Sequence, residues 1–322
     1  MAEVAKKGIA DLLATKNHHP RDDRIIFDED AHTYTVDGDI YPTSVSGIVH
    51  SLFPQFDAEE VIAKNFDKWK DNKQSPYYRY IQYAELRMHL NEDEIKKELA
   101  KTWNAFGNSR AEYGTAIHLS AELFLNEAPR NDPSPEYHQF IEWYKKEKPA
   151  SWVPYRTEWS VFHEPSKTAG QIDGLFQDTA DGSFHMVDWK CVAKLESRHA
   201  FGERGFPPFE ALHNANLNHY LIQQNLYRWI LKQSYGIECK TLRLLQVHYT
   251  IEKATEFELP IFDKEIDKVM QLRCTVSASA AKRHKTIVGT QDDIDINVKK
   301  IDYYKKLIAS LESENDRIRK TL

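Results

Sequence analysis

The sequence is poor in cysteine and has no pair of cysteines spaced to share a metal ion. Its three cysteines, Cys191, Cys239 and Cys274, lie far apart, and no CxxC pair occurs in the 322 residues. This spacing argues against a zinc ribbon, a four-cysteine iron–sulfur cluster and a disulfide framework. We therefore expect a reducing, intracellular compartment: the cytoplasm of a bacterium or of a virus-infected host cell, with an organelle or the nucleus left open.

Long apolar runs and an excess of positive charge are also missing. No apolar stretch is long enough to cross a bilayer, and residues 1–21 are polar and lack the core of a signal peptide. We therefore expect no membrane association. The formal net charge of −6 argues against a broad basic surface for nucleic acid, but it is compatible with a local, carboxylate-rich metal site.

The elements that are present follow an α/β order. Residues 24–48 resemble a small β element with a tight turn at Asp37-Gly38, and the helical pattern that follows has breaks near 72–76, 107–108 and 129–135. Strands, a helix and a further strand then predict a mixed central sheet flanked by helices. We divide the chain into a tail at 1–23, a single domain at 24–290 with a helical part at 57–150 and a core at 151–260, and a C-terminal helix at 291–322.

The predicted C-terminal helix carries an apolar stripe with an asparagine inside it. One interpretation is a short coiled coil that joins a second copy of the chain or a partner protein, with the asparagine fixing the register. The other, which we favour because three heptads are near the lower limit for such a pattern, is an amphipathic helix packed on its own domain. The stripe consists of Ile301, Tyr304, Ile308, Leu311, Asn315, Ile318 and Leu322.

One acid-x-lysine string among four is set in a predicted β-hairpin. The strings are Asp71-Lys73, Glu94-Lys96, Asp188-Lys190 and Glu238-Lys240. The third lies in a predicted strand at 184–190, which follows strands at 155–162 and 169–177. Because side chains alternate between the faces of a strand, Asp188 and Lys190 point the same way.

Two registers of this hairpin are open. With a four-residue loop, Asp173 lies opposite Asp188, with Cβ atoms ~5 Å apart. With a two-residue turn, Asp173 lies opposite Lys190 and diagonal to Asp188. In both registers the carboxylates repel each other unless a proton or a cation lies between them, and we expect Mg²⁺ or Mn²⁺ there.

Two predicted helices add polar side chains to this picture. His118 and Glu122 are four residues apart and share a helix face. Tyr220, Gln223 and Tyr227 share a face of a second helix. Each set alone is more typical of a packed histidine or a solvated polar face, but both flank the hairpin in sequence.

Taken together, these residues resemble the PD-(D/E)XK nuclease superfamily. Asp173 followed by Asp188-Trp189-Lys190 is similar to its signature, with Ile172 in place of the leading proline. Gly114-Thr115-x-x-His118 and Gln223-x-x-x-Tyr227 are similar to motifs of the RecB-like exonuclease branch, which includes exonucleases of phages, large DNA viruses and mitochondrial genome maintenance. The segment 32–46 is also similar to their opening segment, and the resemblance covers roughly residues 25–275.

The resemblance implies a restriction-endonuclease-like core and a role for each site residue. Asp173, Asp188 and Lys190 would be catalytic, with Lys190 positioning the attacking water. Mg²⁺ or Mn²⁺ would be held by the carboxylates, His118 and the Trp189 main-chain carbonyl, with Glu122 and Glu158 as additional candidates. The residues expected to bind the substrate or support the site are Gln223, Tyr227, Tyr220, Lys194, Arg198 and Arg204.

The expected function is a metal-dependent DNA exonuclease acting on single strands or duplex ends, in recombination, repair or replication. One alternative is a structure-specific or restriction-type endonuclease on the same core. Another is a catalytically inactive, nuclease-like protein that binds nucleic acid or serves as a scaffold. The sequence contains no Walker A string, so any coupled motor would be a separate protein.

Overall fold

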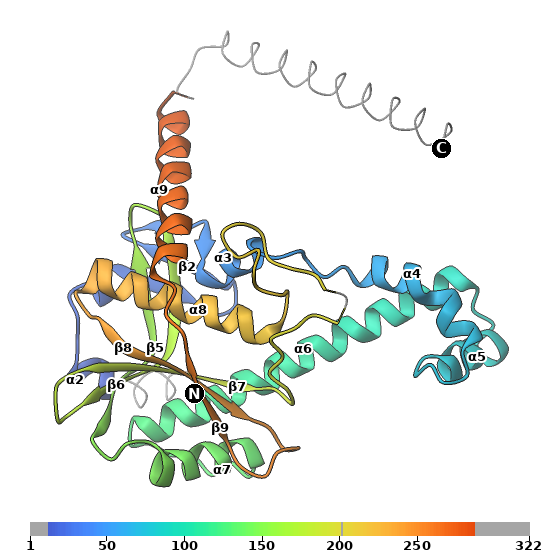
Figure 1. The fold of residues 1–322 in the computed structure, drawn as a ribbon, viewed down its shortest axis with the longest axis horizontal. Helices are drawn as coiled ribbons and strands as arrows, with labels where there is room; N and C mark the ends of the chain where they lie inside the picture. Colours follow the sequence, from blue (N-terminus) through green and yellow to red (C-terminus); the bar gives the residue numbers. More distant parts are fainter. Residues whose placement is uncertain (1–11, 201, 287–322) are drawn as a thin grey trace. The chain divides into compact units, whose positions relative to one another are not determined.

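The computed structural model describes residues 12–200 and 202–286 and has a mixed α/β fold. Figure 1 shows a central sheet with α8 on one side and α6 and α7 on the other. The strands of this sheet are β4 Thr43–Ser44, β5 Trp152–His163, β6 Thr168–Asp178, β7 Phe184–Cys191, β8 Cys239–Val247 and β9 Thr255–Leu259. The helices are α2 Leu12–Lys16, α3 Val45–Ser51, α4 Ala58–Asp71, α5 Tyr78–Arg87, α6 Glu92–Leu125, α7 Pro135–Glu142, α8 Asn216–Ile230 and α9 Asp263–Thr286.

The central sheet contains both parallel and antiparallel pairs. Strand β6 pairs antiparallel with β5 and β7 and parallel with β4. Strand β8 pairs parallel with β7 and antiparallel with β9. The predicted mixed sheet flanked by helices is therefore confirmed.

The predicted N-terminal β element is a separate three-stranded sheet. It consists of β1 Ile25–Asp28, β2 Thr33–Val36 and β3 Asp39–Ile40. The turn between β2 and β3 has positive φ at both Asp37 (52°) and Gly38 (87°). Two successive positive φ angles match the twist of a two-residue hairpin turn, which explains the Asp-Gly pair there.

Residues 12–23, which the sequence assigned to an N-terminal tail, include a short helix and contact the domain. Leu13, in α2, is buried in a hydrophobic cluster with Trp152 of β5. Asp22 forms an ion pair with the buried Arg156 at 2.6 Å and accepts a hydrogen bond from Trp159 Nε1 at 2.8 Å. An ion pair between segments this far apart in sequence leaves no local signal, so the sequence could not predict these contacts.

Helix α6 runs without a break where the sequence predicted one. It begins at a capping box formed by Asn91 and Glu94 and continues through Gly107 and Asn108 to Leu125. One glycine in a helix interior costs only about 1 kcal/mol. Packing at both ends of α6 outweighs that cost, so the prediction of a break at 107–108 is wrong.

The N-terminal half of α6 shares a small hydrophobic core with α4 and α5. This core belongs to the helical part that the sequence predicted at residues 57–150, on the N-terminal side of the predicted core at 151–260. Its buried members are Ile62, Phe66, Ile81, Ala84, Ile95, Leu99 and Ala100. The C-terminal half of α6 packs on the sheet instead, through Ala121 and Leu125. A single helix therefore connects the helical part to the sheet.

The described chain divides into two compact units between Val269 and Met270. The division falls inside α9, whereas the sequence predicted a boundary at residue 290. The predicted C-terminal helix at 291–322 lies outside the described residues. Among the helices that are described, none is both long and apolar enough to cross a membrane.

Candidate active site

Three carboxylates from three neighbouring strands lie in a row across the central sheet. Glu158 is on β5, Asp173 on β6 and Asp188 on β7. The β6–β7 pairing ends at Gly174–Val187, one position before Asp173 and Asp188. Both aspartates therefore lie where the two strands begin to separate, which leaves room between them for other groups.

The hairpin has the register predicted for the four-residue loop. Gln177 pairs with Phe184, and the pairing proceeds from there without a shift towards Asp173 and Asp188. The alternative register, which would place Asp173 opposite Lys190, is not the one observed. The length of the loop therefore decides which side chain faces Asp173.

Helix α6 brings His118 against two of the acids. His118 Nδ1 lies 3.4 Å from Glu158 Oε1 and 3.6 Å from Asp173 Oδ2. One ligand atom from each of these three residues lies within 4.8 Å of the other two. Glu158, which the sequence offered only as an additional ligand, belongs to this compact donor group, whereas Asp188 does not.

Lys190 contacts the other side of the row of acids. Its Nζ donates hydrogen bonds to Asp188 Oδ1 at 3.0 Å and to Asp173 Oδ2 at 3.4 Å. The same Asp173 oxygen accepts a hydrogen bond from the Trp189 main-chain amide at 3.3 Å. The Lys190 ammonium also lies 5.4 Å from the centre of the Tyr220 ring on α8. Asp188 and Lys190 thus share a face, as strand alternation predicted.

Burial and crowded charges shift the pKa values of these groups. Burial, with a further contribution from the Asp173 charge, raises the pKa of Asp188 to about 7. Burial also raises the pKa of Glu158. For His118 burial acts in the opposite direction, but the carboxylates of Asp173 and Glu158 outweigh it and the pKa is raised. The pKa of Lys190 is raised in the same way, because Asp173 and Asp188 outweigh burial, so its ammonium stays protonated.

The donor set fits a hard divalent cation. Within the described part of the chain, Glu158 Oε1 and Asp188 Oδ2 are buried and make no hydrogen bond of good geometry. Their compensation comes only from nearby charge, since Glu158 Oε1 lies 3.4 Å from His118 Nδ1 and Asp188 Oδ2 lies 3.0 Å from Lys190 Nζ. Buried carboxylate oxygens without donors are unfavourable unless a proton or a cation compensates them. Carboxylate oxygens suit both Mg²⁺ and Mn²⁺, and the additional imidazole nitrogen favours Mn²⁺.

Glu158 has an unusual backbone conformation for a residue inside a strand. Its φ is +42°, in the left-handed region, and it lies across from Asp173 at a gap in the β5–β6 pairing. Gln171 Nε2 donates a hydrogen bond to its carbonyl at 3.0 Å. A non-glycine residue in this region costs of order 1–3 kcal/mol. The surrounding strands therefore hold Glu158 in a conformation that turns its side chain towards His118.

A cleft of about 750 Å³ opens beside the donor group. The N-terminal segments contribute several residues to this cleft, and the sequence did not predict any of them individually as site residues. Some of them lie in the segment 32–46, which is similar to the opening segment of RecB-like exonucleases. A set of polar side chains brought together from distant segments has no periodic pattern in the sequence. The residues that line the cleft are Phe27, Glu29, Asp30, His32, Tyr34, Ser44, Ser46, Ala111, Gly114, Thr115, His118, Leu119, Glu122, Glu158, Gln171 and Asp173.

Like Asp188, the predicted metal ligand Glu122 is not part of the compact donor group. Glu122 lines the cleft one helical turn from His118, but its oxygens are not among the atoms within 4.8 Å of one another. The Trp189 main-chain carbonyl stays a predicted ligand. The Trp189 ring is fully buried against the apolar cluster under α6, so its side chain serves packing.

The polar face of α8 only partly reaches the site. Tyr220 contacts Lys190, as described above. Gln223 is half-buried, and no hydrogen bond joins it to Lys190 in the described chain. Tyr227 is only 5% exposed and packs against Gly170, where an added Cβ would lie 2.7 Å from its ring. Because β6 encloses the Tyr227 ring, it offers no free face to a base, and a supporting role for Tyr227 stays a prediction.

The predicted substrate-binding cations lie in the segment between β7 and α8. Lys194 and Arg198 are exposed. Arg204 is also exposed, but its Nη1 donates a hydrogen bond to the Ala211 carbonyl at 2.8 Å, which ties it to its own loop. Lys194 and Arg198 are therefore the freer of the three to meet a phosphate.

Comparison with known proteins yields only distant likenesses. No family model and no curated protein sequence matches the chain. An alkaline exonuclease from Laribacter hongkongensis is 10% identical, with 54% of this chain and 86% of that one covered and a TM-score of 0.29. A candidate exonuclease from Eubacterium rectale is 15% identical, with 73% and 78% covered and a TM-score of 0.30. Scores this low establish neither a shared fold nor a shared activity, so the function has to follow from the site itself.

Proposed function

We propose that this protein is a metal-dependent nuclease that hydrolyses phosphodiester bonds of DNA, acting as an exonuclease on single strands or duplex ends. The observation that carries the proposal is the meeting of His118, Glu158 and Asp173 within 4.8 Å, next to the Asp188–Lys190 pair. A metal donor group beside a fixed ammonium suits phosphodiester hydrolysis, because the ion activates water and polarises the phosphate while the ammonium stabilises negative charge.

In this proposal His118, Glu158 and Asp173 hold Mg²⁺ or Mn²⁺, with Asp188 at its edge. The bound ion supplies a lowered pKa for an attacking water and polarisation of the phosphate. The three buried or half-buried carboxylates support this occupant, because Lys190 is the one permanent cation among the described residues that faces them and a divalent ion would balance the remaining negative charge. Glu122 lies on the same cleft and is a further candidate ligand.

Lys190 positions the attacking water and stabilises the charge that develops on the phosphate oxygens. Its ammonium is held by Asp188 and Asp173 at 3.0 and 3.4 Å, and its raised pKa keeps it charged. A lysine acts here as a compact point charge, whose position is fixed by the two carboxylates. Tyr220 supports that position from α8.

The cleft and the adjoining loop provide contacts for the rest of a strand. Lys194 and Arg198 are exposed cations of that loop, and they offer contacts to backbone phosphates. The cleft is lined from one side by the N-terminal β element and from the other by α6. A cleft bounded on two sides suits a single strand, and the preference for exonuclease action over the endonuclease alternative follows the resemblance of the motifs to those of exonucleases.

The test is cleavage of an end-labelled oligonucleotide with Mg²⁺ or Mn²⁺ by the wild type, Lys190→Ala and Lys240→Ala. Lys240 belongs to another acid-x-lysine string and forms an exposed ion pair with Asp181 at 2.8 Å, so it is a matched control. We expect Lys190→Ala to lose activity about 100-fold or more, while Lys240→Ala keeps it.

Wild-type activity in Lys190→Ala would refute the site assignment. Cleavage of covalently closed circles would favour the endonuclease alternative over the exonuclease. A wild type that binds DNA but shows no metal-dependent cleavage would support the inactive, nuclease-like alternative.

A further inference from the structure

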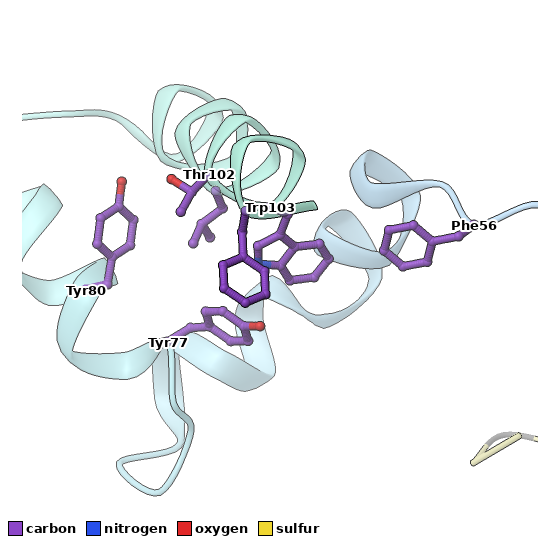
Figure 2. Close-up of a pocket in the computed structure, with 7 residues that line it drawn as sticks. Phe56, Tyr77, Tyr80, Thr102 and Trp103 are labelled. Atoms are coloured by element: carbon purple, nitrogen blue, oxygen red, sulfur yellow. The ribbon is translucent and has the colours of Figure 1, made fainter. Parts of the chain in front are cut away.

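A second hollow, lined by aromatic side chains, lies in the helical part of the fold. It has a volume of about 600 Å³ and is shown in Figure 2. Tyr77 and Tyr80 come from the start of α5, Thr102 and Trp103 from α6, and Phe56 from the segment before α4. Leu99 and Phe106 complete its lining. No charged side chain lines it, so its ligand is expected to present flat or apolar groups.

The aromatic rings of this pocket are arranged around Trp103. Phe56 is stacked on Trp103 with a 29° angle between the ring planes and centroids 6.0 Å apart. The Tyr77 ring lies 5.7 Å from Trp103 at 50°. Figure 2 shows the Tyr77 and Trp103 rings side by side, with Tyr80 on the far side of the hollow.

The packing of the helices does not account for the exposure of two of these rings. The buried core shared by α4, α5 and α6 consists of aliphatic residues and Phe66, and Tyr77, Tyr80 and Trp103 pack against it. Phe56 and Phe106 nevertheless remain 71% and 68% exposed. Clustered, exposed aromatic rings on a folded surface usually mark a binding site, since isolated ones are common but clusters are not.

The pocket is connected to the candidate active site by two routes. Trp103 and His118 lie on the same unbroken helix, about four turns or roughly 22 Å apart. The segment before Phe56 is fixed to the loop that carries the exposed cations, since Phe206 N donates to Leu52 O at 2.8 Å. Asn214 Nδ2 of that loop likewise donates to a main-chain carbonyl just before Phe56, at 2.9 Å.

We propose that this aromatic pocket binds nucleobases of a single strand whose end is held at the active site. This inference rests on the proposed nuclease function. Aromatic rings bind bases by stacking without sequence preference, because every base offers a flat face. At ~3.4 Å per stacked nucleotide, the roughly 22 Å between Trp103 and His118 corresponds to about six or seven nucleotides from the strand end.

The experiment measures binding rather than cleavage, in the presence of a chelator. Fluorescence anisotropy compares labelled 4-mer and 12-mer deoxythymidine oligonucleotides, together with a 12-mer that is abasic at positions 6 and 7. These central positions are equally far from both ends, so the design does not depend on polarity. The proteins are the wild type, the Phe56→Ala/Phe106→Ala double variant and the control Tyr83→Ala/Leu86→Ala, which removes two exposed side chains of α5 outside the pocket.

We expect the pocket variant to bind the 12-mer roughly tenfold or more weakly than the wild type, since each stacked base contributes about that factor. The 4-mer should bind all three proteins alike, because it is too short to reach the pocket. The abasic 12-mer should bind wild type and pocket variant alike, while the control variant behaves as the wild type throughout. Both substituted phenylalanines are exposed, so loss of folding is not expected, and circular dichroism spectra check this.

Equal binding of the intact 12-mer by wild type and pocket variant would overturn the proposal. So would a loss that persists unchanged with the abasic 12-mer, because it would mean that the pocket does not contact bases. Cleavage of the 4-mer with Mg²⁺ or Mn²⁺ tests the nuclease function separately. A wild type that cleaves the 4-mer while the pocket variant binds the 12-mer normally would leave the nuclease proposal standing and remove this one.

Discussion

Single residues at the site combine strain with unsatisfied charge. Glu158 is held at φ +42° inside a strand, and its buried Oε1 makes no well-formed hydrogen bond, with His118 Nδ1 3.4 Å away. Backbone strain of this kind persists only where the surrounding structure enforces it, and it is common at functional sites. The sequence showed a glutamate in a strand but not its conformation, because φ here depends on the pairing of β5 with β6.

The role of Glu158 can be tested by removing its charge. We expect Glu158→Gln to weaken Mn²⁺ binding about 10-fold or more, because the amide cannot neutralise the ion. Glu122→Gln is the matched control, since Glu122 lines the same cleft outside the compact donor group. Isothermal titration calorimetry measures both variants, and equal losses in the two would contradict the assignment.

Asp188 should make the metal-free protein less stable as pH rises. Burial and the Asp173 charge raise its pKa to about 7, against about 4 in an unfolded chain. The folded state therefore binds this proton more tightly than the unfolded state does. The resulting contribution to the free energy of unfolding is complete below pH ~4 and is lost as the pH rises through ~7. In chelator, the melting temperature of the wild type should fall between pH 5 and pH 8 more than that of Asp188→Asn, whose amide does not ionise.

Differential scanning fluorimetry across this pH range provides the measurement. Added Mn²⁺ should restore the wild type at pH 8 and leave Asp188→Asn less affected, because the ion compensates the ionised carboxyl. Parallel melting curves of the two proteins in chelator would count against a buried, high-pKa Asp188.

At the scale of elements, close packing between β6 and its neighbours fixes the site. An added Cβ at Gly174 would lie 2.8 Å from the Trp189 ring, which is fully buried. The strand alternation of β7 was readable from the sequence, and so was the turn at Asp37-Gly38. The continuity of α6 through Gly107 was not, because it depends on packing at both ends of the helix.

Two glycine substitutions should change stability in opposite directions. Gly174→Ala should lower the free energy of unfolding by about 1–3 kcal/mol, since the new methyl group overpacks against Trp189. Gly107→Ala, with nothing within 4 Å of its added Cβ, should raise it by about 0.5–1 kcal/mol, because alanine favours the helix. Urea unfolding measures both, and a stable Gly174→Ala would show that the Trp189 ring can move.

At the scale of the whole molecule, a net charge of −6 limits how strongly DNA can be bound through its phosphates. Of the three cations predicted to bind the substrate, Lys194 and Arg198 are available for phosphates, because Arg204 is tied to the Ala211 carbonyl. Few phosphate contacts predict a weak dependence of binding on salt. Affinity for a strand must then come from the site and from stacked bases.

The salt dependence of single-strand binding tests this expectation. With two phosphate contacts, the slope of log K against log salt concentration should be about −1.4, and Arg198→Ala should reduce its magnitude by about 0.7. Anisotropy titrations at several salt concentrations give the slope. A much steeper slope would mean that a larger basic surface binds the strand.

The sequence by itself determined the features that follow from local geometry. Strand alternation placed Asp188 and Lys190 on one face, and loop length limited the hairpin to two registers. Tertiary structure decided the rest: that Glu158 rather than Asp188 joins His118 and Asp173, that Tyr227 is enclosed by β6, and that an aromatic pocket forms around Trp103. These outcomes depend on contacts between segments far apart in the chain, and the periodicity of a single segment carries no record of such contacts.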